Sequence, residues 1–301
     1  MNTKVLFLFR SVIIFIGLIL LAGTSSWAEE KLVKLTDGVY GIKGKGAKVN
    51  TGIVVGSKGV FVLNCQLDSY KRRLAAIQSV SGGKPIKFVG NGHAAGDDIG
   101  CNAHFEDMGV TIVGSQAMYK HLLVKGPKSY KKRLEKEGSR LVYPHVTFKD
   151  RIVIDLGSHK VHMIYMGKGH TIGDTVVYLP KEKVLFSSDL LFADNNPTLR
   201  EGDSVNWQRI LQKLKSWEIE ALVPGHGPII KGASNVKRTI DALDGYFTDI
   251  RTQVKSMMGA GKGLKEIQKG IDLGKYKKWG RKKHIARNIK VIYTELGGKL
   301  M

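Results

Sequence analysis

The stretch that decides the fold is Asn91-Gly92-His93-Ala94-Ala95-Gly96-Asp97-Asp98-Ile99-Gly100. It follows residues 86–89, a largely apolar run typical of a buried strand that ends where the stretch begins. One histidine and two carboxylates fall within six residues on a glycine-containing turn. Side chains of this kind at the end of a strand can converge on a divalent metal ion. Ala95 stands where a second ligand is expected, so the stretch predicts a metal site with an altered ligand set.

The N-terminal residues have the pattern of an export signal. Lys4 and Arg10 form a basic start, an apolar run follows, and residues 26–28 offer the small side chains of a cleavage site. A membrane anchor is the alternative, but the uncharged apolar run is short for a span of about 20 residues. We therefore expect a signal peptide over residues 1–28, one mature domain over residues 29–301, and a periplasmic or secreted protein.

The chain is strongly basic. Without Lys4 and Arg10, 46 basic and 26 acidic residues remain, a net charge of +20. Residues 231–301, which we expect to form a basic helical C-terminal part, carry 17 basic and 6 acidic residues. Within this part, residues 275–283 form a basic C-terminal run in which lysines and an arginine are mixed with aromatic residues. Clustered charge of this sign attracts an acidic protein or an anionic envelope surface, although a solvated basic face without a partner is the alternative. Nucleic acid suits the charge but not the export signal, so we expect no nucleic-acid partner.

Two cysteines, Cys65 and Cys101, each lie close to the end of a predicted core strand. An exported chain meets an oxidising compartment, in which a disulfide is stable. Neighbouring strands would bring the two thiols together. A disulfide, a buried unpaired pair and a metal ligand all remain open from the sequence.

The predicted elements alternate in a pattern that occurs twice. Short β-branched runs within residues 53–63 precede helical spacing over residues 69–80 and a further strand. Residues 116–141 indicate a largely helical basic stretch that is broken at residues 126–127. A second set of strands is followed by apolar residues at helix spacing over residues 207–217. This repetition predicts a layered α/β domain built from two similar halves.

Four places in the sequence put a metal-capable residue shortly after a strand signal. Side chains at the same ends of several strands meet in an open crevice in α/β architectures. A lone histidine or aspartate on a loop usually packs, caps a helix or faces solvent, so the four places carry weight only together. They are His93 with Asp97 and Asp98, then His170, Asp189 and His226.

The combination resembles the metallo-β-lactamase-fold hydrolase superfamily over nearly all of the mature chain. His93 and Asp97 match the family motif His-x-His-x-Asp-His, and the block that starts at His170 is similar to the family's His-Thr-x-Gly-Asp-Thr. Asp189 matches the aspartate that bridges two metals, and His226 matches the final histidine block. The resemblance implies an α/β fold, a four-layer αββα sandwich of two β-sheets flanked by helices.

Two motif positions depart from the family pattern. Ala95 replaces the second histidine and Asp98 replaces the third, while Asn64 stands where many members have an aspartate. The first metal position of the family then keeps two of its three histidines, His93 and His170. The second metal position keeps its number of ligands, which are Asp97, Asp98 and His226, but Asp98 supplies a carboxylate in place of an imidazole. Asp189 can serve either metal position.

A carboxylate-rich set of this kind favours a divalent ion bound through oxygen. We expect zinc, with iron or manganese as alternatives, and one ion rather than two. An ion would also relieve the repulsion between the crowded carboxylates. Asp97 is the expected catalytic residue, which orients the attacking water. The expected metal ligands are His93, Asp97, Asp98, His170, Asp189 and His226.

Three functions compete on this evidence. The first is an exported metal-dependent hydrolase of a small-molecule ester, thioester, amide or phosphoester, with anionic compounds among its candidate substrates. The second is a non-catalytic periplasmic binding protein on the same fold, with an anionic ligand or an acidic partner, because fold does not dictate function. The third is a redox role for an oxygen-rich iron site or for the two cysteines. The sequence gives no reason to single out β-lactam hydrolysis.

Overall fold

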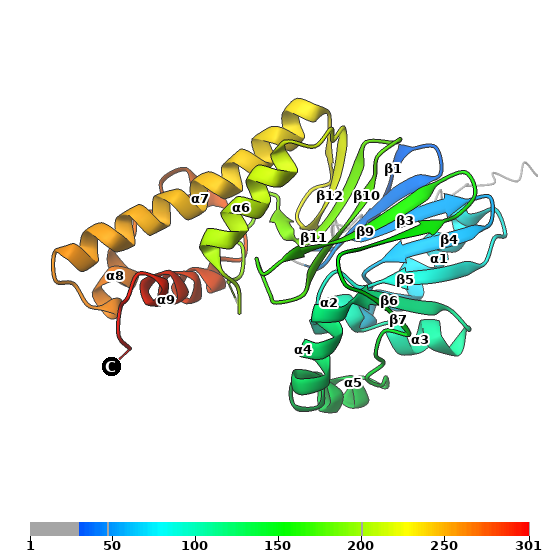
Figure 1. Cartoon of the computed structure of the whole chain (residues 1–301), viewed down its shortest axis with the longest axis horizontal. Coiled ribbons are helices and arrows are strands. Elements are labelled where there is room, and N and C mark those ends of the chain that lie inside the picture. The colour runs from blue at the N-terminus through cyan, green and yellow to red at the C-terminus, as the bar shows by residue number, and fades with distance from the viewer. Residues whose placement is uncertain (1–29, 47, 200, 301) are drawn as a thin grey trace, which may run out of the picture.

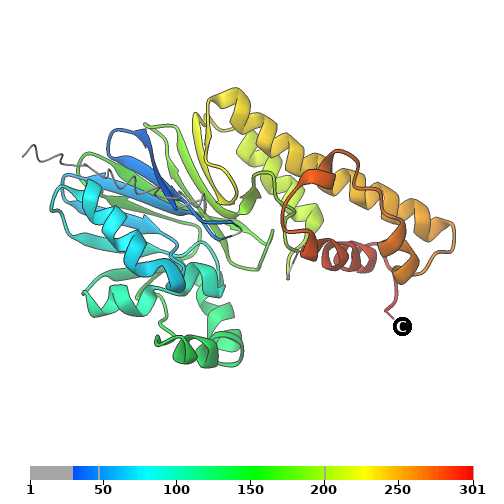
Figure 2. The same ribbon diagram turned by 180° about the vertical axis from the view of Figure 1, so that it is seen from behind.

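The computed structural model describes residues 30–46, 48–199 and 201–300, so the predicted signal peptide lies outside the described residues. In the described part, two β-sheets pack face to face and helices cover the outer face of each (Figure 1). Figure 2 shows the same layers from behind. The predicted αββα sandwich is confirmed. No helix within the described ranges is long and apolar enough to cross a bilayer.

The first sheet has seven strands in the described chain, in the order β1-β2-β3-β4-β5-β6-β7. Neighbours from β1 to β4 are antiparallel, and those from β4 to β7 are parallel. The strands are β1 (Lys31–Thr36), β2 (Val39–Lys43), β3 (Thr51–Gly56), β4 (Gly59–Leu63), β5 (Ile86–Gly90), β6 (Thr111–Ser115) and β7 (Val146–Phe148).

The second sheet has six strands in the described chain, in the order β13-β12-β11-β10-β9-β8. β11 and β12 are parallel and the other neighbours are antiparallel. The strands are β8 (Arg151–Asp155), β9 (Lys160–Gly167), β10 (Asp174–Leu179), β11 (Val184–Phe192), β12 (Ala221–His226) and β13 (Ile230–Lys231).

Helices connect the strands and form the C-terminal part. The α-helices are α1 (Tyr70–Ser81), α2 (Gly96–Ile99), α3 (Asn102–Asp107), α4 (Gln116–Gly126), α5 (Lys132–Lys136), α6 (Ser204–Lys215), α7 (Ala233–Gly259), α8 (Leu264–Gly270) and α9 (Ile285–Glu295). Single helical turns are η1 (Leu67–Ser69), η2 (Pro127–Lys131), η3 (Gly274–Lys278) and η4 (Lys282–His284).

Side chains alternate between the two faces of each sheet, so the core forms separate layers. In β4, Phe61 and Leu63 point between the two sheets, while Val60 and Val62 point to the outer face under α1 and α3. Successive strand residues face opposite sides of a sheet, so one strand supplies two cores. β11 behaves in the same way, and its apolar residues are buried on both faces.

The C-terminal part packs on the outer face of the second sheet and extends beyond it. α6 and the first half of α7 cover the sheet, and Trp207 of α6 is fully buried there. α7 then runs outward, with α8 and α9 beside its far half (Figure 1). Tyr246 of α7 packs against Tyr276 and Trp279, two aromatic residues of the basic C-terminal run.

The structure corrects one boundary. The sequence predicts a break at residues 126–127, and α4 ends at Gly126, but the chain stays helical through η2 and α5. Pro127 is the first residue of η2, a position at which proline's missing N–H costs little. The predicted helix over residues 69–80 forms as α1, one residue later than expected.

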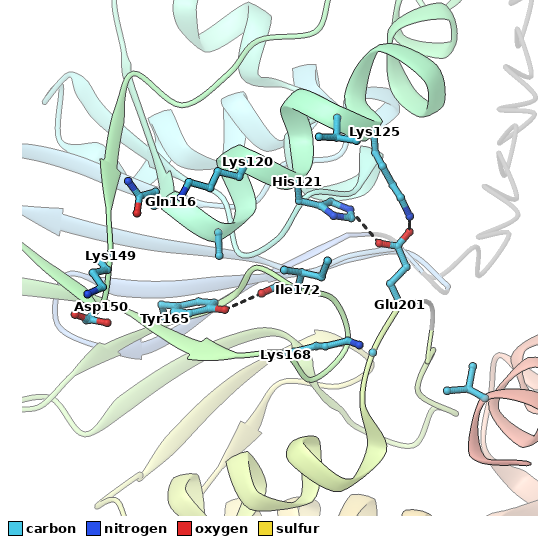
Figure 3. Close-up of a pocket in the computed structure, with 14 residues that line it drawn as sticks. Gln116, Lys120, His121, Lys125, Lys149, Asp150, Tyr165, Lys168, Ile172 and Glu201 are labelled. Carbon is cyan, nitrogen blue, oxygen red and sulfur yellow. Dashed lines mark hydrogen bonds and ion pairs between the residues drawn. The ribbon is translucent and has the colours of Figure 1, made fainter. Parts of the chain in front are cut away.

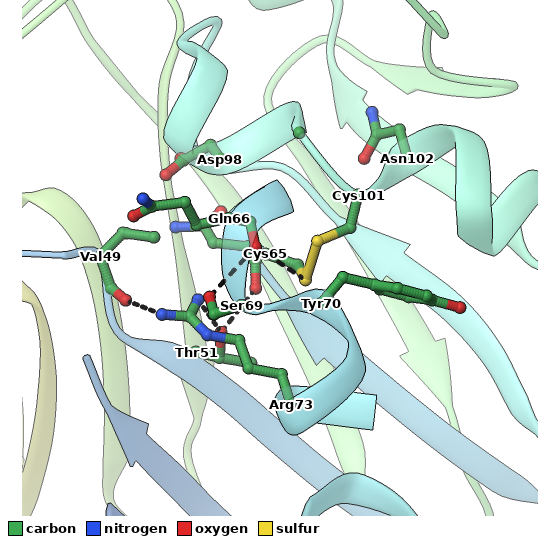
Figure 4. Close-up of a disulfide and its surroundings, with 12 residues drawn as sticks. Val49, Thr51, Cys65, Gln66, Ser69, Tyr70, Arg73, Asp98, Cys101 and Asn102 are labelled. Atoms are coloured by element: carbon green, nitrogen blue, oxygen red, sulfur yellow. Dashed lines mark hydrogen bonds between the residues drawn. A yellow bond between two sulfur atoms is a disulfide. The ribbon is translucent and has the colours of Figure 1, made fainter. Parts of the chain in front are cut away.

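A disulfide joins Cys65 and Cys101, which selects among the three interpretations left open by the sequence (Figure 4). The Cα atoms are 5.4 Å apart, and both residues are buried in the core under α1. The bridge connects the end of β4 to the residue that follows α2 and precedes α3. Because α2 contains Asp97 and Asp98, the bridge fixes the loop in which the metal motif lies.

Candidate metal centre

Five of the six predicted ligand residues follow or end strands, and the sixth, Asp189, lies within one. They are His93, Asp97 and Asp98 after β5, His170 after β9, Asp189 within β11 and His226 at the end of β12. The structure brings them into three overlapping groups whose ligand atoms lie within 4.8 Å of one another. The groups are His93 with His170 and Asp189, His93 with Asp97 and Asp98, and Asp97 with Asp189 and His226.

Asp189 lies between the two later histidines. Its Oδ2 is 3.4 Å from Nε2 of His170, and its Oδ1 is 3.3 Å from Nε2 of His226. Oδ2 of Asp97 lies 3.8 Å from the same His226 nitrogen. The side chain of Asp97 is 34% exposed, whereas those of Asp189 and His226 are buried. Asp97 is therefore the carboxylate of this group that solvent and a small molecule can reach.

Two glycines let the loops of the centre approach closely. A Cβ at Gly225 would lie 2.2 Å from Oδ1 of Asp189, and a Cβ at Gly92 would lie 2.1 Å from Oγ of Ser188. Both distances are far below van der Waals contact, so a larger residue would force the loop away. The residues that precede His226 and His93 thus have a steric reason to be glycine.

Asp98 is in close contact with His93 of the same loop and with Ser188 of β11. Its Oδ2 lies 2.7 Å from Nδ1 of His93 and accepts hydrogen bonds from Oγ of Ser188 at 3.0 Å and from the His93 backbone N–H at 3.1 Å. A carboxylate bound to one ring nitrogen fixes the tautomer and directs the other nitrogen towards a metal. Asp98 can therefore orient His93 through one oxygen and still offer the other oxygen as a ligand.

Buried ligand atoms in the centre provide the test of whether a metal fits. Within the described residues, Nε2 of His93, Oδ1 of Asp98 and Oδ1 of Asp189 are buried and form no hydrogen bond. A buried polar atom left in this way costs about 1–3 kcal/mol. All three are atom types that bind divalent ions, and they come from residues of the groups described above. The residues present therefore fit a metal ion.

The charges of the centre are strongly coupled. Burial opposes the charged form of His93, but the Asp98 carboxylate, with smaller contributions from Asp189 and Asp97, raises the pKa of His93 to about 10. Burial raises the pKa of Asp98, and the nearby His93 offsets only part of this increase. Burial also opposes ionisation of Asp189, yet the nearby His226, His170 and His93 hold its pKa well below the usual range. Asp189 is thus a carboxylate at neutral pH, as a metal ligand must be.

Asn64 and the disulfide hold the metal loop, residues 91–101, against the end of β4. Nδ2 of Asn64 donates to Oγ of Ser188 at 3.0 Å, and its Oδ1 accepts from the backbone N–H of Gly92 at 2.9 Å. The N–H of Cys65 donates to the carbonyl of Asp98, and the N–H of Cys101 donates to the carbonyl of Cys65. The loop is therefore fixed by covalent and hydrogen bonds that surround Asp98.

The C-terminal helices reach the centre through residues 194–199, the segment that follows β11. Nδ1 of His170 contacts the carbonyl oxygen of Thr198. Asn288 of α9, which is fully buried, donates to the carbonyl of Pro197 at 2.8 Å and accepts from the N–H of Leu199 at 2.9 Å. α9 thereby fixes the backbone that orients His170, and Nε2 of His170 is directed towards Asp189.

Arg281 is a residue of the centre that the sequence did not single out. It belongs to the basic C-terminal run, and its Nη1 lies 3.1 Å from Nδ1 and 3.2 Å from Nε2 of His226. Its Nη2 donates to Oγ1 of Thr198 at 3.4 Å. The run itself was visible as a mixture of bases and aromatic residues, but its contact with His226 depends on how the C-terminal helices pack.

A cavity of about 890 Å³ opens beside the loop that carries His170 (Figure 3). Its wall includes Ile172 and Gly202, and a Cβ at Gly202 would lie 3.0 Å from the carbonyl oxygen of His170. Apolar side chains, the carboxylates of Asp150 and Glu201, and four lysines line it. Lys120 and Lys125 belong to α4, and Lys149 and Lys168 come from other segments. The cavity suits a small molecule that combines an apolar part with negative charge.

Known proteins have sequences related to that of this chain. A family model described as "Metallo-beta-lactamase superfamily" matches residues 48–226. A metallo-beta-lactamase type 2 of Bacteroides fragilis is 29% identical over 136 residues, which are 42% of this chain and 54% of that protein. Metallo-beta-lactamase IND-1 of Chryseobacterium indologenes is 26% identical over 217 residues, 69% of this chain and 83% of that protein. The match therefore spans about half the length of the first relative.

Solved structures agree on the fold. The stereoselective inverting sec-alkylsulfatase Pisa1 from Pseudomonas sp. superposes with a TM-score of 0.67 at 15% identity and covers 90% of this chain, which is 51% of that protein. A share of 90% requires part of the C-terminal helices to be included in the superposition. Because the family model matches more than half of the chain, the chain belongs to the metallo-beta-lactamase superfamily of hydrolases.

Proposed function

We propose that this protein is an exported hydrolase that uses one divalent ion in an altered, carboxylate-rich centre. The observation that carries the proposal is that two ligand groups share Asp189 and that three ligand atoms of the centre are buried without a hydrogen bond. Mixed carboxylate and imidazole ligands suit zinc, with iron or manganese as alternatives. The substrate is a small-molecule ester, thioester, amide or phosphoester, and the lysine-lined cavity beside the His170 loop supports an anionic one.

Each residue of the centre has a role in this proposal. His93, His170 and Asp189 hold the ion on one side, and Asp97 and His226 hold it on the other. When bound, the ion lowers the pKa of water and polarises the oxygen of the scissile group. Asp97, the partly exposed carboxylate, accepts a hydrogen bond from the attacking water and directs it at the substrate.

The two motif substitutions act differently. Ala95 is buried and offers no ligand atom. The side of the centre that contains His93 therefore has one ligand fewer, which supports one ion rather than two. Asp98 remains inside a ligand group, where it orients His93 and offers Oδ1. The substitutions therefore alter the centre without removing its ability to hold a cation.

Export is part of the proposal. The pattern of the N-terminal residues supports it, because a basic start, an apolar run and small residues precede position 29. The Cys65–Cys101 disulfide also supports it, since structural disulfides persist in oxidising compartments.

Elemental analysis of protein purified without added metal tests the proposal. We expect about one divalent ion per chain, and hydrolysis of at least one member of a panel of aryl esters, thioesters, amides and phosphoesters. His226→Ala should lose both the ion and hydrolysis, whereas His162→Ala, in β9 outside the ligand groups, should keep both. The proposal fails if the protein stays ion-free and inactive after loading with Zn²⁺, Mn²⁺ and Fe²⁺.

A non-catalytic binding protein is the second candidate, and the four lysines around the cavity favour it. The double variant Ala95→His, Asp98→His separates the two functions. If the natural protein is a binding protein that has lost catalysis, restoring the histidines should raise metal content and hydrolysis together. If the natural centre already works, Asp98→His removes the partner of His93 and should lower activity.

A further inference from the structure

We propose that Asn64 and Ser188 are positioning residues of the metal centre. They form a directed hydrogen-bond network that holds Asp98 and, through it, directs Nε2 of His93 at the ion. This inference rests on the metal-binding part of the proposed function. Its own observations are the directions of the hydrogen bonds between the two sheets and the backbone conformations of the two residues.

Two backbone N–H groups fix the direction of the network at its ends. The N–H of Gly92 donates to Oδ1 of Asn64 at 2.9 Å, so this atom is the amide oxygen and Nδ2 is left to donate. The N–H of His93 donates to Oδ2 of Asp98 at 3.1 Å, so this oxygen is an acceptor. Between them, Oγ of Ser188 accepts from Nδ2 of Asn64 at 3.0 Å and donates its single proton to Oδ2 of Asp98 at 3.0 Å. The hydrogen bonds can therefore run only from Asn64 to Asp98.

Asp98 orients the ring of His93 at the end of the network. Its Oδ2 is 2.7 Å from Nδ1 of His93, so a ring that binds an ion keeps its proton on Nδ1 and its lone pair on Nε2. This Nε2 is buried and forms no hydrogen bond with any described residue, which leaves it for the ion. All four side chains of the network are buried, so water cannot replace a hydrogen bond that is lost.

Asn64 and Ser188 both have left-handed backbone conformations, which non-glycine residues adopt rarely. Asn64, directly after β4 of the first sheet, has a φ of 59°, and Ser188, within β11 of the second sheet, has a φ of 46°. Such conformations persist only where the surroundings impose them, and they cluster at functional sites. Gly92 leaves room for the network, because a Cβ there would lie 2.1 Å from Oγ of Ser188. The backbone is therefore held in the conformation that brings the two side chains together.

The missing ligand at Ala95 makes the orientation of His93 more important. With one ligand fewer on this side of the centre, fewer bonds to the ion are available to hold the ring in place. A ligand that is oriented before the ion binds loses less conformational freedom on binding, which raises the affinity. Partners that orient a ligating histidine typically contribute about 10- to 100-fold to metal affinity. We therefore expect an effect of this size from Asn64 and Ser188.

The metal affinity of glycine variants tests the inference. Glycine adopts a left-handed conformation without strain, so Asn64→Gly and Ser188→Gly remove the side chains and allow the backbone to keep its course. Each variant should bind Zn²⁺ about 10- to 100-fold more weakly in competition with a chromophoric chelator. The double variant should lose little more than either single variant, because both substitutions break the same network. The visible absorption spectrum of the Co²⁺-loaded protein, which reports ligand geometry, should change in all three variants.

Ser187→Gly is the matched control, because Ser187 is the buried neighbour in β11 and its hydroxyl donates to the carbonyl of Ser188, outside the network. It should keep the natural Zn²⁺ affinity and Co²⁺ spectrum even if it unfolds more easily. Gly92→Ala tests the network by a second route, since it keeps every polar group but displaces Oγ of Ser188. It should weaken Zn²⁺ binding as the glycine variants do, and circular dichroism confirms that each variant is folded.

The inference is overturned if Asn64→Gly and Ser188→Gly bind Zn²⁺ as tightly as the natural protein. It is also overturned if their losses multiply in the double variant, because the two residues would then act separately. A loss in Ser187→Gly as large as that in Ser188→Gly would overturn it too, because flexibility of β11 would then explain both. A natural protein that binds neither Zn²⁺ nor Co²⁺ is a different failure, because it removes the proposed function as well.

Discussion

Removing the Cys65–Cys101 disulfide should destabilise the protein and loosen its metal loop. The two cysteines are 36 residues apart in sequence, and the loop-entropy relation gives about 4 kcal/mol of stabilisation for a closed loop of this size. The double variant Cys65→Ala, Cys101→Ala should lose most of this amount from the free energy of unfolding. Denaturant unfolding followed by circular dichroism measures it.

The same variant should also bind metal more weakly than the natural protein. The bridge holds the segment that follows Asp98, whose carbonyl accepts from the N–H of Cys65. A loop that is free to move must be ordered when the ion binds, which lowers affinity. A thiol-free phosphine reductant supplies the control, because it should reproduce the loss in the natural protein and leave the variant unchanged. If reduction changed neither the unfolding midpoint nor the metal affinity, the conclusion that the disulfide fixes the metal loop would be wrong.

Three further predictions concern other parts of the centre. Gly225→Ala should displace the Asp189 carboxylate, because the new Cβ would lie 2.2 Å from Oδ1, and elemental analysis should show loss of the ion. Asn288→Ala should lower metal affinity more than it lowers the melting temperature, because Asn288 fixes the backbone on both sides of Thr198; equal affinity would contradict that role. Burial raises the pKa of Asp174 to about 6 from 3.8, so the folded state holds this proton more tightly than the unfolded state. The free energy of unfolding should therefore fall between about pH 4 and pH 6, by about 1.4 kcal/mol for each unit of pKa difference, and Asp174→Asn should flatten this slope.

Local pattern was sufficient to predict individual elements, whereas the four-layer sandwich was expected from the resemblance to a known family. The β-branched run of β4 and the helical spacing of α1 depend on neighbouring residues, so both were readable without tertiary information. The break expected at Pro127 was wrong because a proline at the first residue of a helical turn leaves the chain free to continue. Tertiary packing decides whether the helix continues past the proline. Leu134 of α5 contributes to this packing, since it is buried beside α2 and α4.

The candidate centre was predictable where it follows motif spacing and unpredictable where it depends on packing. His93, His170, Asp189 and His226 lie in recognisable blocks after strands, and the structure brings them together. Arg281 lies in a run whose charge suggested a surface for an anionic partner. In the structure the aromatic residues of that run pack on α7 and turn Arg281 towards the centre, a contact between distant segments that no local signal reports.

The centre is assembled from loops distributed over most of the chain, from His93 after β5 to Arg281 just before α9. The loop with His93, Asp97 and Asp98 supplies one ligand group, but the other two groups each combine residues from separate segments, so the complete centre forms only when the chain folds. Metal uptake must accompany the last step of folding, because binding and folding are linked. Affinity alone discriminates poorly among first-row divalent ions. On the proposed function, the compartment in which folding finishes would therefore select the metal through the ions that it supplies.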